Sequence, residues 1–294
     1  MRQPYPVEIP PLLPLFLTKR RAKMTFPLQK TEELGLDRPA FVWAINLSYR
    51  GDRGASAEPG DLTSVYGTIQ GRWLPMAAAV RGAGLAEERS GRWYLTENGR
   101  GLAAAMHEAA RAHYATQSPL PKEELAELAR LLDRAFLAAA KASEPSTRQH
   151  TPFAFVYRAD DPPAGSFAQL DAAVYGLWQV RDDCHMAAWR ASDLSGPEIE
   201  LLTRLWREEA ADEAALADLV PHQRAEDISA ALARLRRDGL VEADDLKATS
   251  RGAAARQKIE DETDRLFFTP WPDDVGAKSA WLAERLIQVN TALV

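Results

Sequence analysis

Apolar residues recur at helical spacing along most of the chain, and two such stretches end in the same way. Residues 77–99 read AAAVRGAGLAEERSGRWYLTENG, and residues 230–252 read AALARLRRDGLVEADDLKATSRG. Each is a helix, a Gly-Leu pair, a short charged turn and a threonine three residues before a glycine. The first of these glycines is expected to end its helix, because glycine adopts the left-handed conformation without strain. The pattern predicts an internal duplication of a unit of about 110–130 residues.

Each unit is predicted to hold three helices before its turn. The apolar spacing places these helices at residues 38–49, 60–66 and 72–82 in the first unit, and at residues 196–208, 212–219 and 224–237 in the second. In the first unit a Ser90-Gly91 turn joins two predicted strands, residues 84–88 and 92–95. Three helices followed by a hairpin form a winged helix-turn-helix. The predicted fold is therefore mainly α with small β-hairpin wings, as two tandem winged helix-turn-helix units with long flanking helices.

The remaining segments define the predicted domain boundaries. These are an N-terminal arm at 1–32, the first unit with its C-terminal helices at 33–145, a linker at 146–165, and a long helix with the second unit and its C-terminal helices at 166–294. The run PFAFVY, residues 152–157, has the aromatic and β-branched composition of a short strand. Residues 1–23 are expected to be either a flexible arm or an over-extended start of the reading frame.

Composition narrows the function classes. The 294 residues carry a formal charge of −6, which argues against non-specific coating of nucleic acid or membrane. A single cysteine, Cys184, excludes an intrachain disulfide and suits a reducing cytoplasm, and no apolar stretch approaches the length of a membrane span. There is no Gly-rich phosphate loop, and the histidines have no zinc-ligand spacing. We expect no enzyme, no catalytic residues, no cofactor and no metal.

Residues 215–245, ALADLVPHQRAEDISAALARLRRDGLVEADD, resemble the MarR family of winged-helix regulators. The recognition helix of that family ends in a similar Leu-x-x-x-Gly-Leu-Val. The resemblance implies a transcriptional regulator that binds double-stranded DNA and responds to a small aromatic or acidic effector. Because MarR proteins are dimers held by flanking helices, it also implies a pseudo-dimer within one chain, monomeric or paired as a homodimer.

The candidate DNA contacts are polar side chains at the reading ends of the two units and at the first wing. They are Thr68, Gln70, Arg72, Arg89 and Arg92 in the first unit, and Gln223, Arg224, Arg234 and Arg237 in the second. In the second unit Gln223 and Arg224 are expected to reach base edges, while Arg234 and Arg237 hold phosphates. Two acids at the start of the same helix leave open the alternative of solvated charges on an amphipathic helix. The first unit has no interleaved acids and is expected to bind more strongly.

One further cluster lies on the long helix at residues 166–190. Trp178, Asp182, His185 and Trp189 follow at spacings of four, three and four, which places them on one helix face. Two indoles around an acid and an imidazole suit an effector pocket. The alternative is a buried His–Asp hydrogen bond covered by packed indoles.

Two functions remain open on these patterns. The first is a DNA-binding transcriptional regulator of MarR-like type. The second is a winged-helix module that binds protein or ligand without binding DNA. An enzyme at the Trp178–His185 face is the least favoured.

Overall fold

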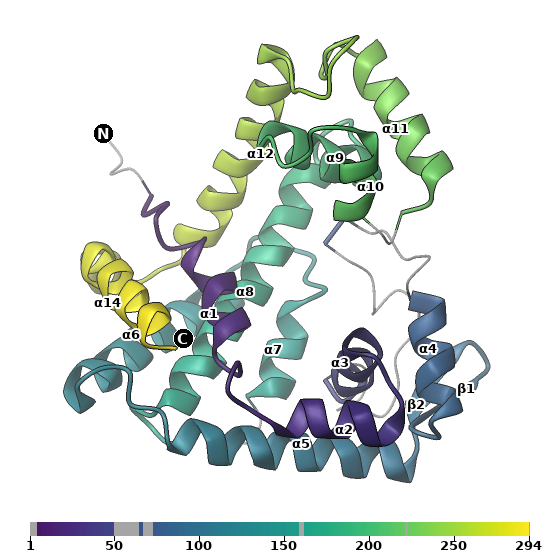
Figure 1. The fold of residues 1–294 in the computed structure, drawn as a ribbon. Coiled ribbons are helices and arrows are strands. Elements are labelled where there is room, and N and C mark those ends of the chain that lie inside the picture. Colours follow the sequence, from purple (N-terminus) through teal and green to yellow (C-terminus); the bar gives the residue numbers. More distant parts are fainter. Residues whose placement is uncertain (1–4, 50–64, 67–72, 159–161, 221–222, 294) are drawn as a thin grey trace.

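The computed structural model describes residues 5–49, 65–66, 73–158, 162–220 and 223–293. These residues form helices and one two-stranded antiparallel sheet. A long central helix, α8 (Phe167–Arg190), joins the part of the molecule at the top of Figure 1 to the part below. Of the described helices, none is long and apolar enough to cross a membrane.

The elements that precede α8 build the lower part of Figure 1. They are α1 (Leu12–Lys19), α2 (Phe26–Leu34), α3 (Arg38–Leu47), α4 (Trp73–Gly82), β1 (Ala86–Arg89), β2 (Arg92–Leu95), α5 (Glu97–Ala115), α6 (Lys122–Lys141) and α7 (Thr151–Tyr157). The β1–β2 hairpin predicted for the first unit is confirmed, with Ala86 opposite Leu95 and Arg89 opposite Arg92. Ser90 and Gly91 both take positive φ at its turn, as a tight hairpin requires.

The elements after α8 build the upper part and then return to the lower one (Figure 1). They are α9 (Gly196–Trp206), α10 (Glu213–Leu219), α11 (Ala225–Arg237), α12 (Ser250–Phe268), α13 (Asp273–Gly276) and α14 (Ser279–Ala292). All three helices predicted for the second unit are present. Its wing is reduced to one isolated bridge between Val241 and Ala248. The intervening Ala-Asp-Asp run explains this, because these residues are poor strand formers.

Two small cores fix the helix-turn-helix elements. In the first unit the buried rings of Trp43 on α3 and Trp93 on β2 meet edge to face, with centroids 5.4 Å apart. In the second, Ile228, Leu232 and Leu235 bury one face of α11 against α9 and α10. The apolar residues of α11 thus lie on one buried helix face.

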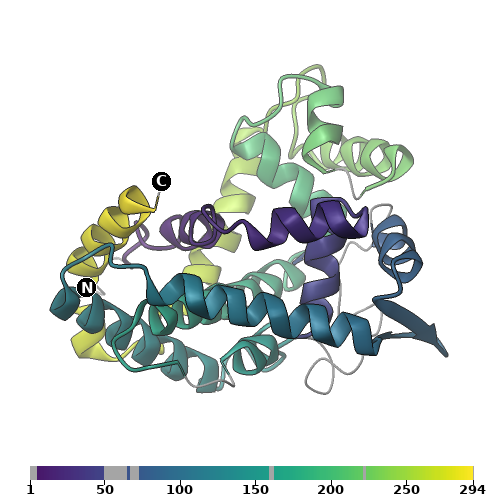
Figure 2. The same cartoon turned by 60° about the horizontal axis from the view of Figure 1, so that its bottom comes forward.

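The largest core surrounds α8. Helices α1, α6, α7 and α12 all pack on α8, and Figure 2 shows the lower helices gathered along it. Gly176 lies against the ring of Phe136, and a Cβ there would come within 2.6 Å of that ring. Helix α14 packs on α1, and its Ile287 is 52% exposed.

The N-terminal arm is part of this core in its described portion. Ile9, Leu13 and Phe16 are fully buried, and α1 packs between α8 and α14. The expectation of a flexible arm over residues 1–23 is therefore wrong for residues 5–23. Within α1, Leu13 and Phe16 form the buried side, while Leu15 is 41% exposed.

The run PFAFVY is a helix, α7, and the predicted strand is wrong. The cause is Asp183 of α8, whose carboxylate is buried at the start of α7. It accepts hydrogen bonds from the amides of Gln149, His150 and Thr151 at 2.7–2.8 Å, and from the Thr151 hydroxyl at 2.7 Å. A carboxylate at a helix N-terminus satisfies amides that have no partner within the helix.

Candidate nucleic-acid interface

Helix α11 is the helix that the sequence predicts to read DNA in the second unit, and its solvent-facing side carries short side chains. Ser229, Ala230 and Ala233 are all exposed there, opposite the buried apolar face. Short side chains on an exposed helix face allow a close approach to another surface. The predicted DNA contacts of α11 are therefore limited to the polar residues at its two ends.

The polar residues at the start of α11 contact protein groups. Arg224 donates two hydrogen bonds to Asp227, at 2.8 and 3.0 Å, and this contact lowers the pKa of that carboxyl. Gln223 donates from Nε2 to the buried carboxylate of Glu200 at 2.7 Å. The two side chains predicted to reach base edges are thus engaged within the chain.

Arg234 is likewise held by neighbouring acids. Its Nε lies 3.1 Å from the buried carboxylate of Glu198 and 3.7 Å from Asp238. Glu198 also accepts a hydrogen bond from the amide of Ser195, where it completes the capping box of α9. This carboxylate serves two partners, so Arg234 is a structural contact between α11 and α9.

Arg237 differs from the other candidate cations of α11. It is exposed and makes no ion pair with any described residue. It lines an open groove of about 1110 Å³ between the end of α8, the end of α11 and α12. Of the second-unit candidates, it is the one positioned to contact an external anion.

The same groove holds two cations that sequence reasoning missed. Arg251 and Lys258 of α12 are exposed, line the groove and form no ion pair within the described part of the chain. They are seven residues apart, two helical turns, and so share one face. The Arg251 guanidinium lies beside Gly239, just after α11. A net charge summed over residues 221–260 hides them, because the acids in that stretch all lie outside the segment from Arg251 to Lys258.

Acidic side chains also line this groove, and two are neutralised. Glu262 accepts hydrogen bonds from Nε and Nη2 of Arg265, at 2.8 and 2.7 Å, and Asp238 lies next to Arg234. The remaining groove acids are Asp193 and Asp261. The groove lining thus holds four cations and four carboxylates, and its formal charges balance. Three of those cations, Arg237, Arg251 and Lys258, form no ion pair with a described residue.

The first-unit candidates lie in two places. Thr68, Gln70 and Arg72 are outside the described residues. Arg89 and Arg92 flank the tip of the hairpin, as predicted. Arg89 is exposed and ion-paired with Glu87, and its guanidinium lies 5.6 Å from the centroid of the Tyr94 ring. Arg92 is half-buried. The basic wing tip is thus present, and Arg89 is already ion-paired with Glu87.

The Trp178 face of α8 is packed rather than open. His185 is 6% exposed, with Nδ1 3.2 Å from the Thr263 hydroxyl and its ring edge to face with Tyr66. Trp189 is buried and donates from Nε1 to the Val65 carbonyl at 2.9 Å. Burial lowers the pKa of His185 to about 3, and the nearby Arg256 charge adds to that effect. Half-buried Trp178 packs on the main core, while Asp182 is half-buried.

Comparison with known sequences places the chain among helix-turn-helix proteins. Residues 92–294 match a helix-turn-helix family, a stretch that begins at β2 and includes the whole second unit. No curated protein and no solved structure gave a match. Family membership suggests a DNA-binding regulator in general. Because the match spans more than half of its length, the chain belongs to this helix-turn-helix family.

Proposed function

We propose that the chain is a DNA-binding transcriptional regulator of MarR-like winged-helix type. In this proposal α11 lies in a major groove, and Arg237, Arg251 and Lys258 hold the phosphates beside it. The observation that carries the proposal is this trio of exposed cations without ion pairs, grouped in one groove at the end of α11. Phosphate contacts of this kind position a protein on the duplex and supply most of its non-specific affinity.

The first unit would supply a second contact surface in the same proposal. Arg89 and Arg92 at the hairpin tip would reach the backbone, with Thr68, Gln70 and Arg72 at the reading end. If the two units are duplicates, they would read two half-sites from one chain, as a monomeric pseudo-dimer. A homodimer would read twice as many half-sites. Sedimentation of the protein with and without DNA distinguishes the monomer from the homodimer.

An effector response also belongs to the proposal. The Trp178, Asp182, His185 and Trp189 face supports it weakly, because His185 and Trp189 already bond to protein groups. A shift of the DNA-binding curve on addition of a small aromatic acid would reveal the response.

The test is a fluorescence-anisotropy titration of the full chain with labelled random-sequence duplex across a salt series. Binding is expected at about 50 mM salt, with log K falling linearly against log salt by about 0.9 for each phosphate contacted. A pull-down of genomic DNA followed by sequencing would then identify the preferred site. Absence of binding at low salt to both the random and the genomic pools would refute the proposal.

A second function, a protein- or ligand-binding module without DNA, is favoured by one observation. The start of α11 carries exposed Glu226 next to the Arg224–Asp227 pair, a poor surface for phosphate. The same titration distinguishes the two functions, since the module would show no salt-dependent binding to duplex.

A further inference from the structure

The two helix-turn-helix units have separate hydrophobic cores. In the first unit, buried residues of α3, α4, β2 and α5 surround Trp43 and Trp93. In the second, buried residues of α9, α10 and α11 surround Leu232. A third, smaller cluster is distinct from both and consists of Ala188 and Trp189 of α8, Ile199 of α9 and Ile259 of α12. Units with separate cores keep one relative placement only where a further contact joins them.

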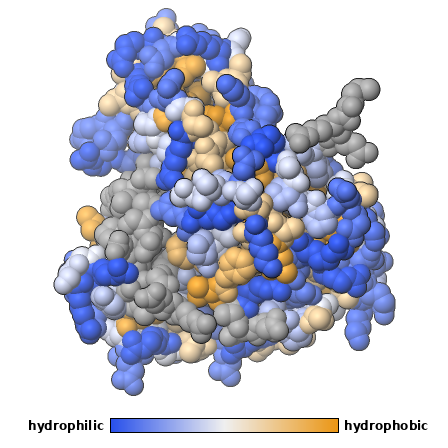
Figure 3. Space-filling model, turned by 180° about the vertical axis from the view of Figure 1, so that it is seen from behind, coloured by the Kyte–Doolittle hydropathy of each residue, from blue (hydrophilic) through white to orange (hydrophobic). Residues whose placement is uncertain are grey.

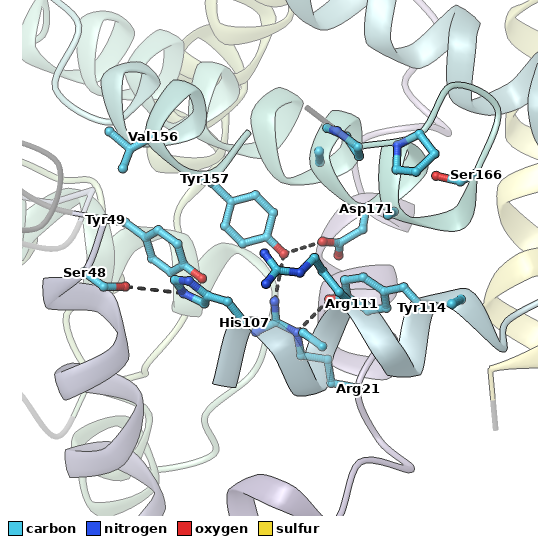
Figure 4. Close-up of a pocket in the computed structure, with 16 residues that line it drawn as sticks. Arg21, Ser48, Tyr49, His107, Arg111, Tyr114, Val156, Tyr157, Ser166 and Asp171 are labelled. Carbon is cyan, nitrogen blue, oxygen red and sulfur yellow. Dashed lines mark hydrogen bonds between the residues drawn. The ribbon is translucent and has the colours of Figure 1, made fainter. Parts of the chain in front are cut away.

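The joint between the first unit and helices α7 and α8 is incompletely packed. A cavity of about 360 Å³, lined by Arg21, Tyr49 and Tyr157 among others, lies along it. Figure 4 shows Tyr49, just after α3, facing Tyr157 of α7, and their ring centroids are 5.1 Å apart. Seen from behind, Figure 3 shows apolar surface left open near the centre of the lower half of the molecule. Because an interface that contains a cavity resists rotation less than a close-packed one, this joint does not by itself fix the first unit.

Val65 and Tyr66 connect the first unit to the third cluster. In the sequence they lie between α3 and α4, and in the structure they contact α8 and α9. Nε1 of Trp189 donates a hydrogen bond to the Val65 carbonyl at 2.9 Å. The Tyr66 ring packs on the third cluster and meets the ring of His185 edge to face, with centroids 5.7 Å apart. We call this contact, of Val65 and Tyr66 with α8 and α9, the clasp.

The first residue of α9, Gly196, shows how closely the clasp fits. A Cβ at this position would lie 1.7 Å from the Tyr66 carbonyl oxygen and 2.8 Å from its carbonyl carbon. The φ of Gly196 lies outside the left-handed region, so its own backbone conformation does not require glycine. The close approach of the Tyr66 backbone does require it. Any side chain at position 196 must therefore push α9 and Tyr66 apart.

The hydroxyl end of Tyr66 reaches polar groups that belong to the second unit. Burial raises the pKa of this phenol, and the nearby charge of Arg256 opposes the effect. Glu200 and Thr203 of α9 also act on the hydroxyl. Glu200 accepts a hydrogen bond at 2.7 Å from Gln223, which lies at the start of α11. The clasp is thus linked through α9 to the position of α11.

We propose that Val65 and Tyr66 clasp the first unit to the second and lock α4 and α11 in one relative placement. With the clasp closed, the two helices move as one body. With it open, both cores stay folded and the units reorient about the joint that contains the cavity. The consequence for DNA rests on the proposed function. Units that are already placed engage one duplex without first being ordered, so the clasp adds affinity for a duplex long enough to reach both.

The first test uses no DNA and measures the distance between the units. Nitroxide labels on Ala79→Cys and Ala214→Cys, at exposed positions of α4 and α10, report it by double electron–electron resonance. The native Cys184 is buried and does not take a label. The parent should give one narrow distance distribution, and Gly196→Ala should broaden or shift it. Gly101→Ala is the matched control, at an exposed helical glycine where no described atom lies within 4 Å of a Cβ, and should leave it unchanged.

Tyr66→Ala opens the clasp without adding an atom, and it decides the test if Gly196→Ala does not fold. It should broaden the distribution, while Tyr66→Phe, which keeps the ring, should broaden it less. Hydrogen exchange should show the core amides of α3 and α11 protected as in the parent. A parent-like distribution in folded Tyr66→Ala would overturn the proposal. Lost protection in either core would overturn it too, because the effect would then be unfolding of a unit.

The second test compares duplexes of about 12 and about 36 base pairs in anisotropy titrations. The parent should prefer the longer duplex, because both units can engage it. Tyr66→Ala should reduce that preference by about threefold or more and bind the short duplex like the parent. Both proteins meet the same number of sites on each duplex, so the ratio isolates the clasp. An unchanged ratio would overturn its role in DNA binding. Absence of binding to both duplexes would refute the proposed function, while the label distances still decide whether the clasp locks the units.

Discussion

Thr96, at the start of α5, and Thr249, at the start of α12, make the same two hydrogen bonds. Each accepts from the amide of the glycine three residues later, at 3.1 and 3.0 Å, and each donates at 2.7 Å to the carbonyl of the glycine that ends the preceding helix. A Cβ on the later glycine, Gly99 or Gly252, would lie 2.0 Å from a leucine carbonyl oxygen. The same helix connection is thus built twice, which supports the predicted duplication.

Loss of either threonine cap should destabilise the protein to a similar degree. Thr96→Ala and Thr249→Ala are each expected to lower the free energy of unfolding by about 1 kcal/mol, because each leaves a helix amide without its acceptor. Thr→Ser at the same positions keeps the oxygen and should cost less. Urea denaturation measures the free energy of unfolding of all four threonine variants. Gly252→Ala should cost more than either cap, and a Gly252→Ala protein of parent stability would contradict the close approach.

Asp183 is expected to be the most sensitive acid of α8. Asp183→Ala removes the acceptor of four hydrogen bonds in a buried place and should cost about 3 kcal/mol or more. Asp183→Asn keeps one carbonyl oxygen as an acceptor and should lose only part of that free energy of unfolding. The control is Asp193→Ala at an exposed position, expected to stay within about 0.5 kcal/mol of the parent. Equal stability of the Asp183 and Asp193 alanine variants in urea would rule out this role.

His185 should make the protein less stable in acid. Its pKa is lowered to about 3, chiefly by burial, so below about pH 6.5 the unfolded chain binds a proton that the folded chain does not. The stability associated with neutral His185 is fully present above that pH and is lost as the pH falls from 6.5 towards 3, by up to about 1.4 kcal/mol per pH unit.

His185→Gln removes that titration. Urea unfolding at pH 7 and pH 5 should show a smaller drop in stability for His185→Gln than for the parent, even though the variant is less stable at pH 7. The control is His113→Gln, since His113 is half-buried on α5 and hydrogen-bonded to the Arg20 carbonyl. If His185→Gln loses as much stability between pH 7 and pH 5 as the parent does, then other groups cause the loss of stability in acid.

Within the proposed DNA interface, the arginines should differ in a specific order. Arg237→Ala and Arg251→Ala should each weaken binding across all sequences and reduce the salt slope by about one unit, as expected for lost phosphate contacts. Arg234→Ala should leave the slope unchanged, because its guanidinium is held by Glu198. Anisotropy titrations of these variants, with Arg130→Ala as the remote control, provide the ranking. A larger slope change for Arg234→Ala than for Arg237→Ala would contradict it.

The local signals in the sequence were sufficient for the second helix-turn-helix. Three local signals define it: buried positions at helical spacing on α11, the capping box of α9 and the glycine after α11. Each acts over a few residues, so the linear sequence contains it. The first hairpin follows the same logic, because its Ser90-Gly91 turn determines the register of both strands. Family membership agrees with these elements.

Tertiary contacts decided the remainder. Residues 152–157 favour a strand locally, but a carboxylate from α8 stabilises a helix. Ile9, Leu13 and Phe16 are buried because α8 and α14 offer them an apolar surface. The cavity lined by Arg21, Tyr49 and Tyr157 draws its wall from α5, α7, α8 and the end of α3, and the groove at Arg237 draws its wall from three helices. Burial and charge pairing between distant segments depend on how the helices pack, and no pattern of neighbouring residues contains that information.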